Sequence, residues 1–127
     1  MENDYKHSDI TDKIIRAFYN VYNRLGFGFL EKVYERALII ELKKFELSGH
    51  SQVPITVYYD DEEVGSYFAD ILVENCVIVE LKTGEGLVEQ HEAQLINYLR
   101  ATDIEVGLLL NFGLKPAVKR KVFTNKQ

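Results

Sequence analysis

Three charged residues lie inside two short segments that have the character of buried strands. Asp70 falls within Tyr67–Val73, and both Glu80 and Lys82 fall within Val77–Lys82. Both segments are rich in β-branched and aromatic residues and are bounded by turn formers, which is typical of strands. A buried charge costs free energy unless it is paired or binds a metal. Two acids and one amine placed this way therefore predict a metal site that carries its own ammonium group.

The spacing D-x9-E-x-K suits metal-dependent cleavage of phosphodiester bonds. Carboxylate oxygens are ligands that Mg²⁺ prefers, and a bound divalent metal lowers the pKa of water and offsets charge on the scissile phosphate. Glu80 and Lys82 are two residues apart in a strand and share one face of it. Lys82 would orient the attacking water or stabilise the phosphorane. The alternative is a structural ion pair at a sheet edge, because the motif is short.

Two further acids precede this region on an expected helix. Glu31 and Glu35 are four residues apart, so they lie on one helix face and repel each other slightly. A metal or Lys82 would compensate for that repulsion. The alternative is an ordinary solvated helix face.

A polar stripe also follows the acidic strands, on the helix expected from Leu87 to Ala101. His91, Gln94 and Tyr98 recur there at helical spacing. Gln94 and Tyr98 would hydrogen-bond a substrate phosphate or the catalytic lysine, and the alternative is packing at a helix–sheet boundary. His91 is interpreted as a boundary residue.

Composition limits the class of protein. The 127 residues have a net charge of −5 and suit a single domain spanning 1–127. No apolar run approaches the roughly 18–20 residues of a membrane span, and the polar start MENDYKHSDI lacks a signal-peptide core. A single cysteine, Cys76, excludes an internal disulfide and a cysteine-ligated zinc site, and it has no evident base for a nucleophilic role. We expect a cytoplasmic protein with no membrane partner.

The charge is unevenly distributed. The acidic balance argues mildly against nucleic-acid binding, but the last 13 residues contain five cations and no acid, namely Lys115, Lys119, Arg120, Lys121 and Lys126. Among them Lys119, Arg120 and Lys121 would contact phosphates from one side. The alternative is a solvated C-terminal tail.

Periodicity predicts an α-α-β-β-β-α-β order. Apolar residues at helical spacing predict a first helix ending near Leu25, capped by Ser8 or Asp9. A second helix is expected from about Phe29 to Phe45, and its inner stripe would comprise Leu30, Val33, Tyr34, Ala37, Leu38 and Leu42. The expected strands and last helix are Pro54–Tyr59, Tyr67–Val73, Val77–Lys82, Leu87–Ala101 (helix) and Val106–Asn111. This order implies an α/β (α+β) fold with a mixed central sheet flanked by helices.

The metal site also constrains the hairpin that joins the two acidic strands. A two-residue loop at Glu74-Asn75 would pair Val73 with Cys76 and put the carboxylates of Asp70 and Glu80 on opposite faces. A shared site therefore requires a bulge, or a three-residue loop that pairs Val73 with Val77.

The segment Gly28–Tyr34 fits G-x-x-E-x-x-Y and resembles the small bacterial and archaeal GxxExxY protein family. YFADILV, VIVELK, HEAQLINYL and GLLLNFG are similar to that family in the same order, over about residues 11–123. The family is placed in the PD-(D/E)XK nuclease superfamily, whose restriction-endonuclease-like core has an α-β-β-β-α-β order. The order expected here is the same with one extra N-terminal helix.

The resemblance implies a Mg²⁺- or Mn²⁺-dependent nuclease that acts on nucleic acid, with DNA favoured over RNA. Asp70 matches the superfamily aspartate, without the proline that often precedes it, and Glu80 and Lys82 match the E-x-K pair. Asp70 and Glu80 would be the primary metal ligands, with the carbonyl of Leu81 as a further one.

The resemblance also assigns the remaining acids and the last helix. Glu31 or Glu35 would bind the metal through water or hold Lys82. Gln94 and Tyr98 match the Q-x-x-x-Y motif of RecB-type nuclease domains and would position the substrate backbone. The rival hypothesis is a catalytically silent binding or assembly module of the same fold. A homodimer or larger assembly is compatible with either hypothesis.

Overall fold

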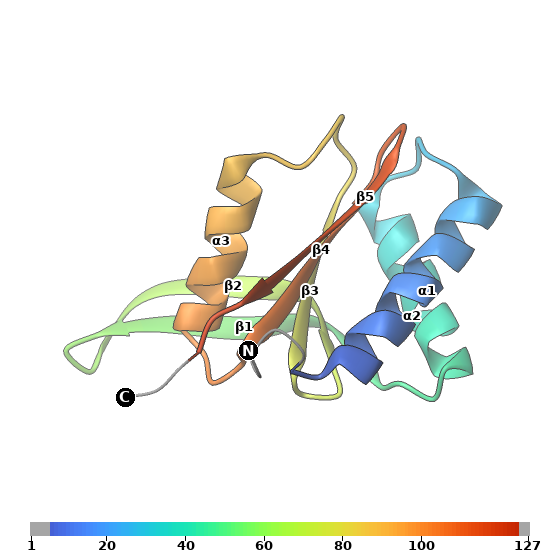
Figure 1. Cartoon of the computed structure of the whole chain (residues 1–127). Helices are drawn as coiled ribbons and strands as arrows, with labels where there is room; N and C mark the ends of the chain where they lie inside the picture. The colour runs from blue at the N-terminus through green and yellow to red at the C-terminus, as the bar shows by residue number, and fades with distance from the viewer. Residues whose placement is uncertain (1–5, 125–127) are drawn as a thin grey trace.

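The computed structural model describes residues 6–124. Three helices and five strands follow one another in the order α1 Ser8–Leu25, α2 Glu31–Lys44, β1 Gly49–Tyr59, β2 Glu62–Val73, β3 Val77–Lys82, α3 Glu89–Arg100, β4 Val106–Phe112 and β5 Pro116–Val122 (Figure 1). The predicted order is confirmed through β4, and β5 is an addition to it.

The sheet is mixed, as predicted, with strand order β1-β2-β3-β4-β5. Only β3 and β4 run parallel, with α3 as the crossover between them, and the other neighbouring strands are antiparallel. Figure 1 shows α1 and α2 on one side of the sheet and α3 on the other. None of the helices within residues 6–124 combines the length and the apolar character that crossing a membrane requires.

Much of the basic C-terminal segment, which the charge pattern described as a tail, forms strand β5. It begins at Pro116 and carries three consecutive cations, Lys119–Lys121, and proline and lysine are both typical of edge strands. It pairs with β4 along its whole length, from Phe112↔Pro116 to Val106↔Val122. Lys126, which the charge pattern also included, lies outside the described residues.

The face under α1 and α2 holds an apolar core. The Tyr34 ring is fully buried and stacks on Phe112, with ring centroids 4.2 Å apart and an interplanar angle of 14°. Its hydroxyl donates to the carbonyl of Gly26 at 2.6 Å. Gly26 and Gly28 have φ of 69° and 113°, which favour glycine. The glycine and tyrosine of G-x-x-E-x-x-Y therefore shape and fasten the turn between α1 and α2.

The face under α3 holds a second, smaller core. Leu95 and Leu99 of α3 are fully buried, and Leu109 of β4 packs with them. A Cβ atom on Gly107 would lie 2.6 Å from a methyl carbon of Leu95, so this glycine is what lets the helix approach β4.

Two local predictions are wrong. Neither Ser8 nor Asp9 caps α1, because the chain enters the helix at His7, in the left-handed region, with no side-chain cap. Leu30 and Val33 do not lie on the inner stripe of α2, since their exposed fractions are 78% and 38%. Leu30 is the residue before the helix, and the buried face of α2 comprises Tyr34, Glu35, Leu38, Glu41 and Leu42.

The hairpin between β2 and β3 has the register that a shared acidic site requires. Its ladder starts at Val73↔Val77 and ends at Ile71↔Val79, so the loop has three residues, Glu74-Asn75-Cys76. Both Glu74 and Asn75 adopt positive φ, at 53° and 56°. The two-residue loop is excluded, and the next opposed residues beyond the ladder are Asp70 and Glu80.

Candidate active site

Asp70 and Glu80 meet where β2 and β3 part. The Glu80 carboxylate accepts a hydrogen bond from the backbone N–H of Asp70 at 2.8 Å, and the Asp70 carboxylate accepts one from the N–H of Leu81, also at 2.8 Å. Each side chain thus takes the place of a missing backbone partner in the opened ladder. The two acids are therefore adjacent across the opened ladder, while the shared metal site that their spacing predicts stays a prediction.

Crowding raises the pKa of both carboxyls. Burial raises the pKa of Glu80 to about 8, with a further contribution from the charge of Asp70. Burial also raises the pKa of Asp70, and the Glu35 charge adds to this, while the Leu81 N–H and Lys82 act in the opposite direction. Near neutral pH the pair carries less than its full negative charge, and a cation would let it ionise.

Lys82 supplies one cation to this cluster. It is the last residue of β3, two positions after Glu80 and therefore on the same face. Its charge lowers the pKa of Glu31, Asp70 and Glu80. The three charged strand residues thus form one cluster, as predicted from their spacing.

Both candidate acids of α2 reach the cluster, by different routes. The exposed Glu31 has a raised pKa because of partial burial and then the charge of Asp70, while Lys82 opposes the rise. Glu35 is 5% exposed and pairs with Lys32 at 3.5 Å. The charges of both acids act on Asp70 or are acted on by it, and the role of either one at a metal stays a prediction.

Gln52 is a site residue that the sequence did not reveal. Its amide donates to Glu35 at 3.2 Å, and its side chain also hydrogen-bonds Asp70. It reaches both because β1 bends there, with φ of 54° at Gln52 itself. No pattern marks this glutamine, since its position depends on a local backbone conformation.

The polar stripe of α3 borders the cluster on its other side. Tyr98 is buried, and desolvation followed by the charges of Glu80 and Asp70 raises its pKa to about 12. Its hydroxyl therefore stays protonated at neutral pH. Gln94 lies one turn earlier on the same side and lines the same cavity as Tyr98. His91 caps the start of α3, because its Nδ1 accepts the N–H of Val88 at 3.2 Å, in keeping with a boundary role.

The cations of β5 contact groups outside the cluster of Asp70 and Glu80. Lys119 and Lys121 pair with Glu92 at 3.8 and 2.6 Å. Arg120 donates to the backbone carbonyl of Lys6. Glu92 is on the side of α3 opposite Gln94 and Tyr98, so the helix separates Lys119 and Lys121 from the acidic cluster.

Asn111 is a second residue that the sequence did not reveal. It lies beside Lys82 in the parallel ladder and is fully buried. Its amide donates to the carbonyl of Gly84 at 3.0 Å, and a Cβ on Gly113 would approach that same carbonyl to 2.2 Å. Asn111 and Gly113 thus hold the loop that follows Lys82, and a polar residue in the apolar run VGLLLN was the available signal.

The donor set suits a divalent cation, although its geometry is not that of a formed metal centre. Within residues 6–124 no group of three or more His, Cys, Asp or Glu side chains is arranged to hold a metal ion. Asp70 and Glu80 each use one oxygen to accept a hydrogen bond from a backbone N–H. Each keeps a second oxygen, and burial and mutual repulsion favour a hard cation between them. Asp70 and Glu80, with Glu31 or Glu35, fit Mg²⁺ or Mn²⁺ by chemistry.

Comparison with known proteins identifies the family and the fold of the chain. A family model described as PD-(D/E)XK nuclease superfamily matches residues 8–122. Among solved structures, the crystal structure of SSO0001 is similar, with a TM-score of 0.59 and 18% sequence identity. The match covers 98% of this chain but 63% of SSO0001, and at this identity it shows the fold alone. No protein of curated function matches the chain.

Proposed function

Because the chain belongs to the PD-(D/E)XK nuclease superfamily, we propose that it is a metal-dependent nuclease that hydrolyses phosphodiester bonds in DNA. The observation that carries the proposal is the reciprocal pairing of Asp70 and Glu80 beside Lys82, at the point where the sheet opens. The G-x-x-E-x-x-Y segment supports placement in the GxxExxY group, since its tyrosine and glycine help to form the turn that precedes Glu31. Cytoplasmic location and self-association stay predictions.

Asp70 and Glu80 would hold Mg²⁺ or Mn²⁺, with Glu31 or Glu35 contributing through water. When bound, the cation supplies Lewis-acid stabilisation of negative charge on the scissile phosphate. The raised pKa of the Glu80 carboxyl means that it must lose its proton before it can serve as a ligand. Activity is therefore expected to rise with pH toward about 8.

Lys82 and Tyr98 would act on the substrate itself. The Lys82 ammonium, held on the acidic face, can donate a hydrogen bond to the attacking water or to a phosphate oxygen that gains charge. The Tyr98 hydroxyl is a donor over the whole working pH range because of its raised pKa. Gln94 offers an amide donor one turn away on the same side of α3 and would help to position the backbone.

A second candidate function is a catalytically silent binding module of this fold. It is supported by the hydrogen bonds that the two carboxylates accept from the backbone N–H groups of Asp70 and Leu81, because these bonds give both acids a structural role in the opened ladder. An acidic protein of net charge −5 also approaches phosphates less readily than a basic one. Metal binding and turnover separate the two functions.

The deciding experiment incubates the protein with single- and double-stranded DNA and RNA in Mg²⁺, Mn²⁺ or EDTA. Cleavage is expected with metal only, and Lys82→Ala is expected to lower its rate by at least about 100-fold. Lys13→Ala, at an exposed position of α1, serves as the matched control and should cleave like the wild type. Equal rates for Lys82→Ala, or cleavage in EDTA, would contradict the proposal.

A thermal-shift titration with Mg²⁺ tests the alternative that the protein is a catalytically silent binding module. Mg²⁺ is expected to raise the melting temperature of the wild type but not that of Asp70→Asn, because a ligand that binds only the folded state stabilises it. Stabilisation without cleavage of any substrate would favour the binding module over the nuclease.

A further inference from the structure

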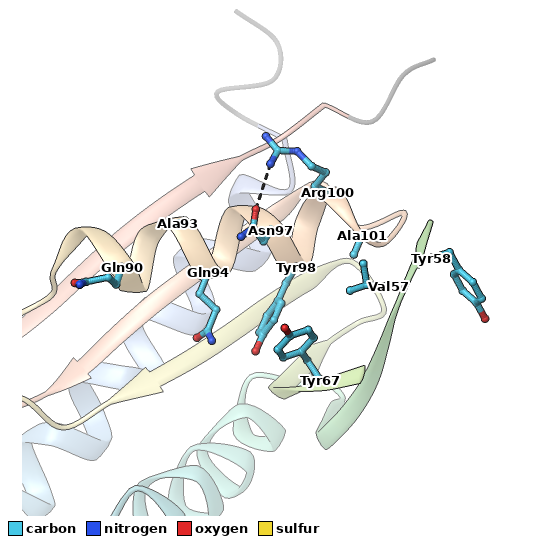
Figure 2. A pocket seen from close by; sticks show the side chains of 10 residues that line it. All are labelled: Val57, Tyr58, Tyr67, Gln90, Ala93, Gln94, Asn97, Tyr98, Arg100 and Ala101. Atoms are coloured by element: carbon cyan, nitrogen blue, oxygen red, sulfur yellow. Dashed lines mark hydrogen bonds between the residues drawn. The ribbon is translucent and has the colours of Figure 1, made fainter. Parts of the chain in front are cut away.

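A cavity of about 680 Å³ lies between α3 and the outer part of the β1–β2 hairpin (Figure 2). One side of α3 supplies most of its wall, and the hairpin closes it with Val57, Tyr58 and Tyr67. Cavities of this volume take a small molecule or a single nucleotide unit. Tyr98 belongs both to this wall and to the surroundings of Asp70 and Glu80, so the cavity adjoins the acidic cluster.

The lining is uncharged except at one end. Gln90, Gln94 and Asn97 present a row of amides along α3, and Arg100 at the end of the row donates to Asn97 at 3.2 Å. Among residues 6–124, no acid lines the cavity. Within the described chain, the amides of Gln90 and Gln94 have no hydrogen-bond partner, so both are available to a ligand.

Two tyrosine rings form the aromatic part of the cavity. Figure 2 shows Tyr67 and Tyr98 pointing toward one another, with Gln94 beside them, whereas Tyr58 points away. The centroids of the Tyr67 and Tyr98 rings are 5.7 Å apart and their planes are tilted by 47°, so the rings do not stack on each other. Tyr67 is 48% exposed, and part of its surface is open to a ligand.

We propose that this cavity binds the base of an unpaired nucleotide, through the Tyr67 ring and the amides of α3, so that the protein acts on single-stranded nucleic acid. The ligand chemistry is that of a nucleobase: a flat uncharged ring, with donors and acceptors on its edge. The inference rests on the proposed nuclease function. The base in the cavity would belong to a nucleic-acid strand whose scissile phosphate lies beside Asp70 and Glu80.

The requirement for an unpaired base follows from the position of the cavity. The bases of a duplex are stacked inside the helix and cannot enter a cavity beside the backbone unless they leave the stack. A single strand meets no such cost, and aromatic rings hold its bases with little sequence preference. The acidic tip of the hairpin, Asp60–Glu63, does not line the cavity and does not oppose the base.

The test measures binding by fluorescence anisotropy in Ca²⁺, with labelled single-stranded DNA of about 12 nucleotides and a blunt duplex of the same sequence. Tyr67→Leu removes the ring while keeping an apolar side chain at a half-exposed position. Tyr59→Leu is the matched control, because Tyr59 lies on the same hairpin, is 71% exposed and does not line the cavity.

The wild type is expected to bind the single strand more tightly than the duplex. Tyr67→Leu should weaken single-strand binding by roughly 5- to 150-fold, which is the usual cost of losing one base–aromatic contact. Tyr59→Leu should stay within about twofold of the wild type. An abasic site moved along the strand should reproduce the loss at one or two adjacent positions.

Several results would overturn the inference: equal affinity of Tyr67→Leu and wild type, tighter binding to the duplex, or abasic positions that are all alike. Competition by a free nucleotide as effective as by the strand would assign the cavity to small molecules and would also overturn it. Tighter binding of RNA of the same sequence would support the base-binding cavity and would identify RNA rather than DNA as the preferred strand. If cleavage fails while Tyr67-dependent binding persists, only the nuclease proposal fails.

Discussion

The two faces of the same sheet differ in what their buried polar groups do. Under α1 and α2 the core is continuous, and its central tyrosine, Tyr34, uses its hydroxyl to close a turn. Under α3 the core is small, and next to it Glu80 is buried with its carboxyl pKa raised to about 8. The buried hydroxyl at the centre of the first core is hydrogen-bonded within the fold, whereas beside the second core two neighbouring carboxylates repel each other.

The difference shows where stability and reactivity are separated in this domain. Helices α1 and α2 fix the sheet, so the face under α3 can tolerate repelling acids and an open cavity. Substitutions should therefore have opposite effects on the two faces. Removing a buried side chain on the first face should destabilise the protein, and removing a charge on the second should stabilise it.

The largest effect is expected from Tyr34→Ala. It empties a fully buried position that stacks on Phe112, and such substitutions cost about 3–5 kcal/mol of the free energy of unfolding. Urea denaturation measures the loss. Tyr34→Phe keeps the ring and removes the bond to Gly26, so about 1 kcal/mol is expected for it. A loss under 1 kcal/mol for the alanine variant would mean that this face is not the stabilising one.

The next effect concerns Glu80→Gln in EDTA. The pKa of the Glu80 carboxyl is raised in the folded state, so between its ordinary value of 4.5 and about 8 the folded protein binds the extra proton. The free energy of unfolding therefore falls as pH rises through that window and is unaffected by this group below it. Glu80→Gln removes the fall and should stabilise the protein by about 1–3 kcal/mol at pH 8. Melting curves from pH 5 to 8 measure both.

Glu41→Gln is the matched control on the other face. Glu41 is also buried, at 8% exposure, but it accepts from Asn20 at 3.1 Å and pairs with Lys44 at 3.3 Å. This variant should lose stability, because it breaks that ion pair. If both glutamine variants shift the melting temperature in the same direction at pH 8, the proposed contrast between the faces fails.

The smallest effect is expected on the far side of α3. Phosphate contacts contribute a slope of about −0.9 each in a plot of log affinity against log salt. Lys119 and Lys121 are already paired with Glu92, so neutralising both to Gln should leave the slope for single-stranded DNA within about 0.5 of the wild type. A slope flatter by nearly two would restore the interpretation that these cations bind the substrate, as the charge pattern suggested.

Much of the fold was accessible from periodicity, because strands and helices that bury one face must repeat at 2.0 or 3.6 residues. The exception is β5 at the sheet edge, because its consecutive cations gave no apolar pattern from which a strand could be predicted. The position of Leu30 was mistaken because its apolar character suggested burial, although it precedes the helix and is exposed.

The acids and Lys82 were accessible for a different reason, since charge inside a strand is costly enough to be informative. Gln52, Tyr67 and Asn111 were not singled out. Gln52 depends on a bend in β1, Tyr67 on the way the hairpin closes against α3, and Asn111 on the approach of Gly84. Such contacts between distant segments leave no local pattern in one sequence.

The three-residue loop Glu74-Asn75-Cys76 has a consequence for how this gene can change. Ile71, Val73, Val77 and Val79 are buried in the core, so their packing rather than the loop length fixes which residues of β2 and β3 oppose each other. A residue inserted between Glu74 and Cys76 would lengthen the loop and leave Asp70 opposite Glu80. Single-codon insertions at this loop should therefore be tolerated better than substitutions at the four core positions.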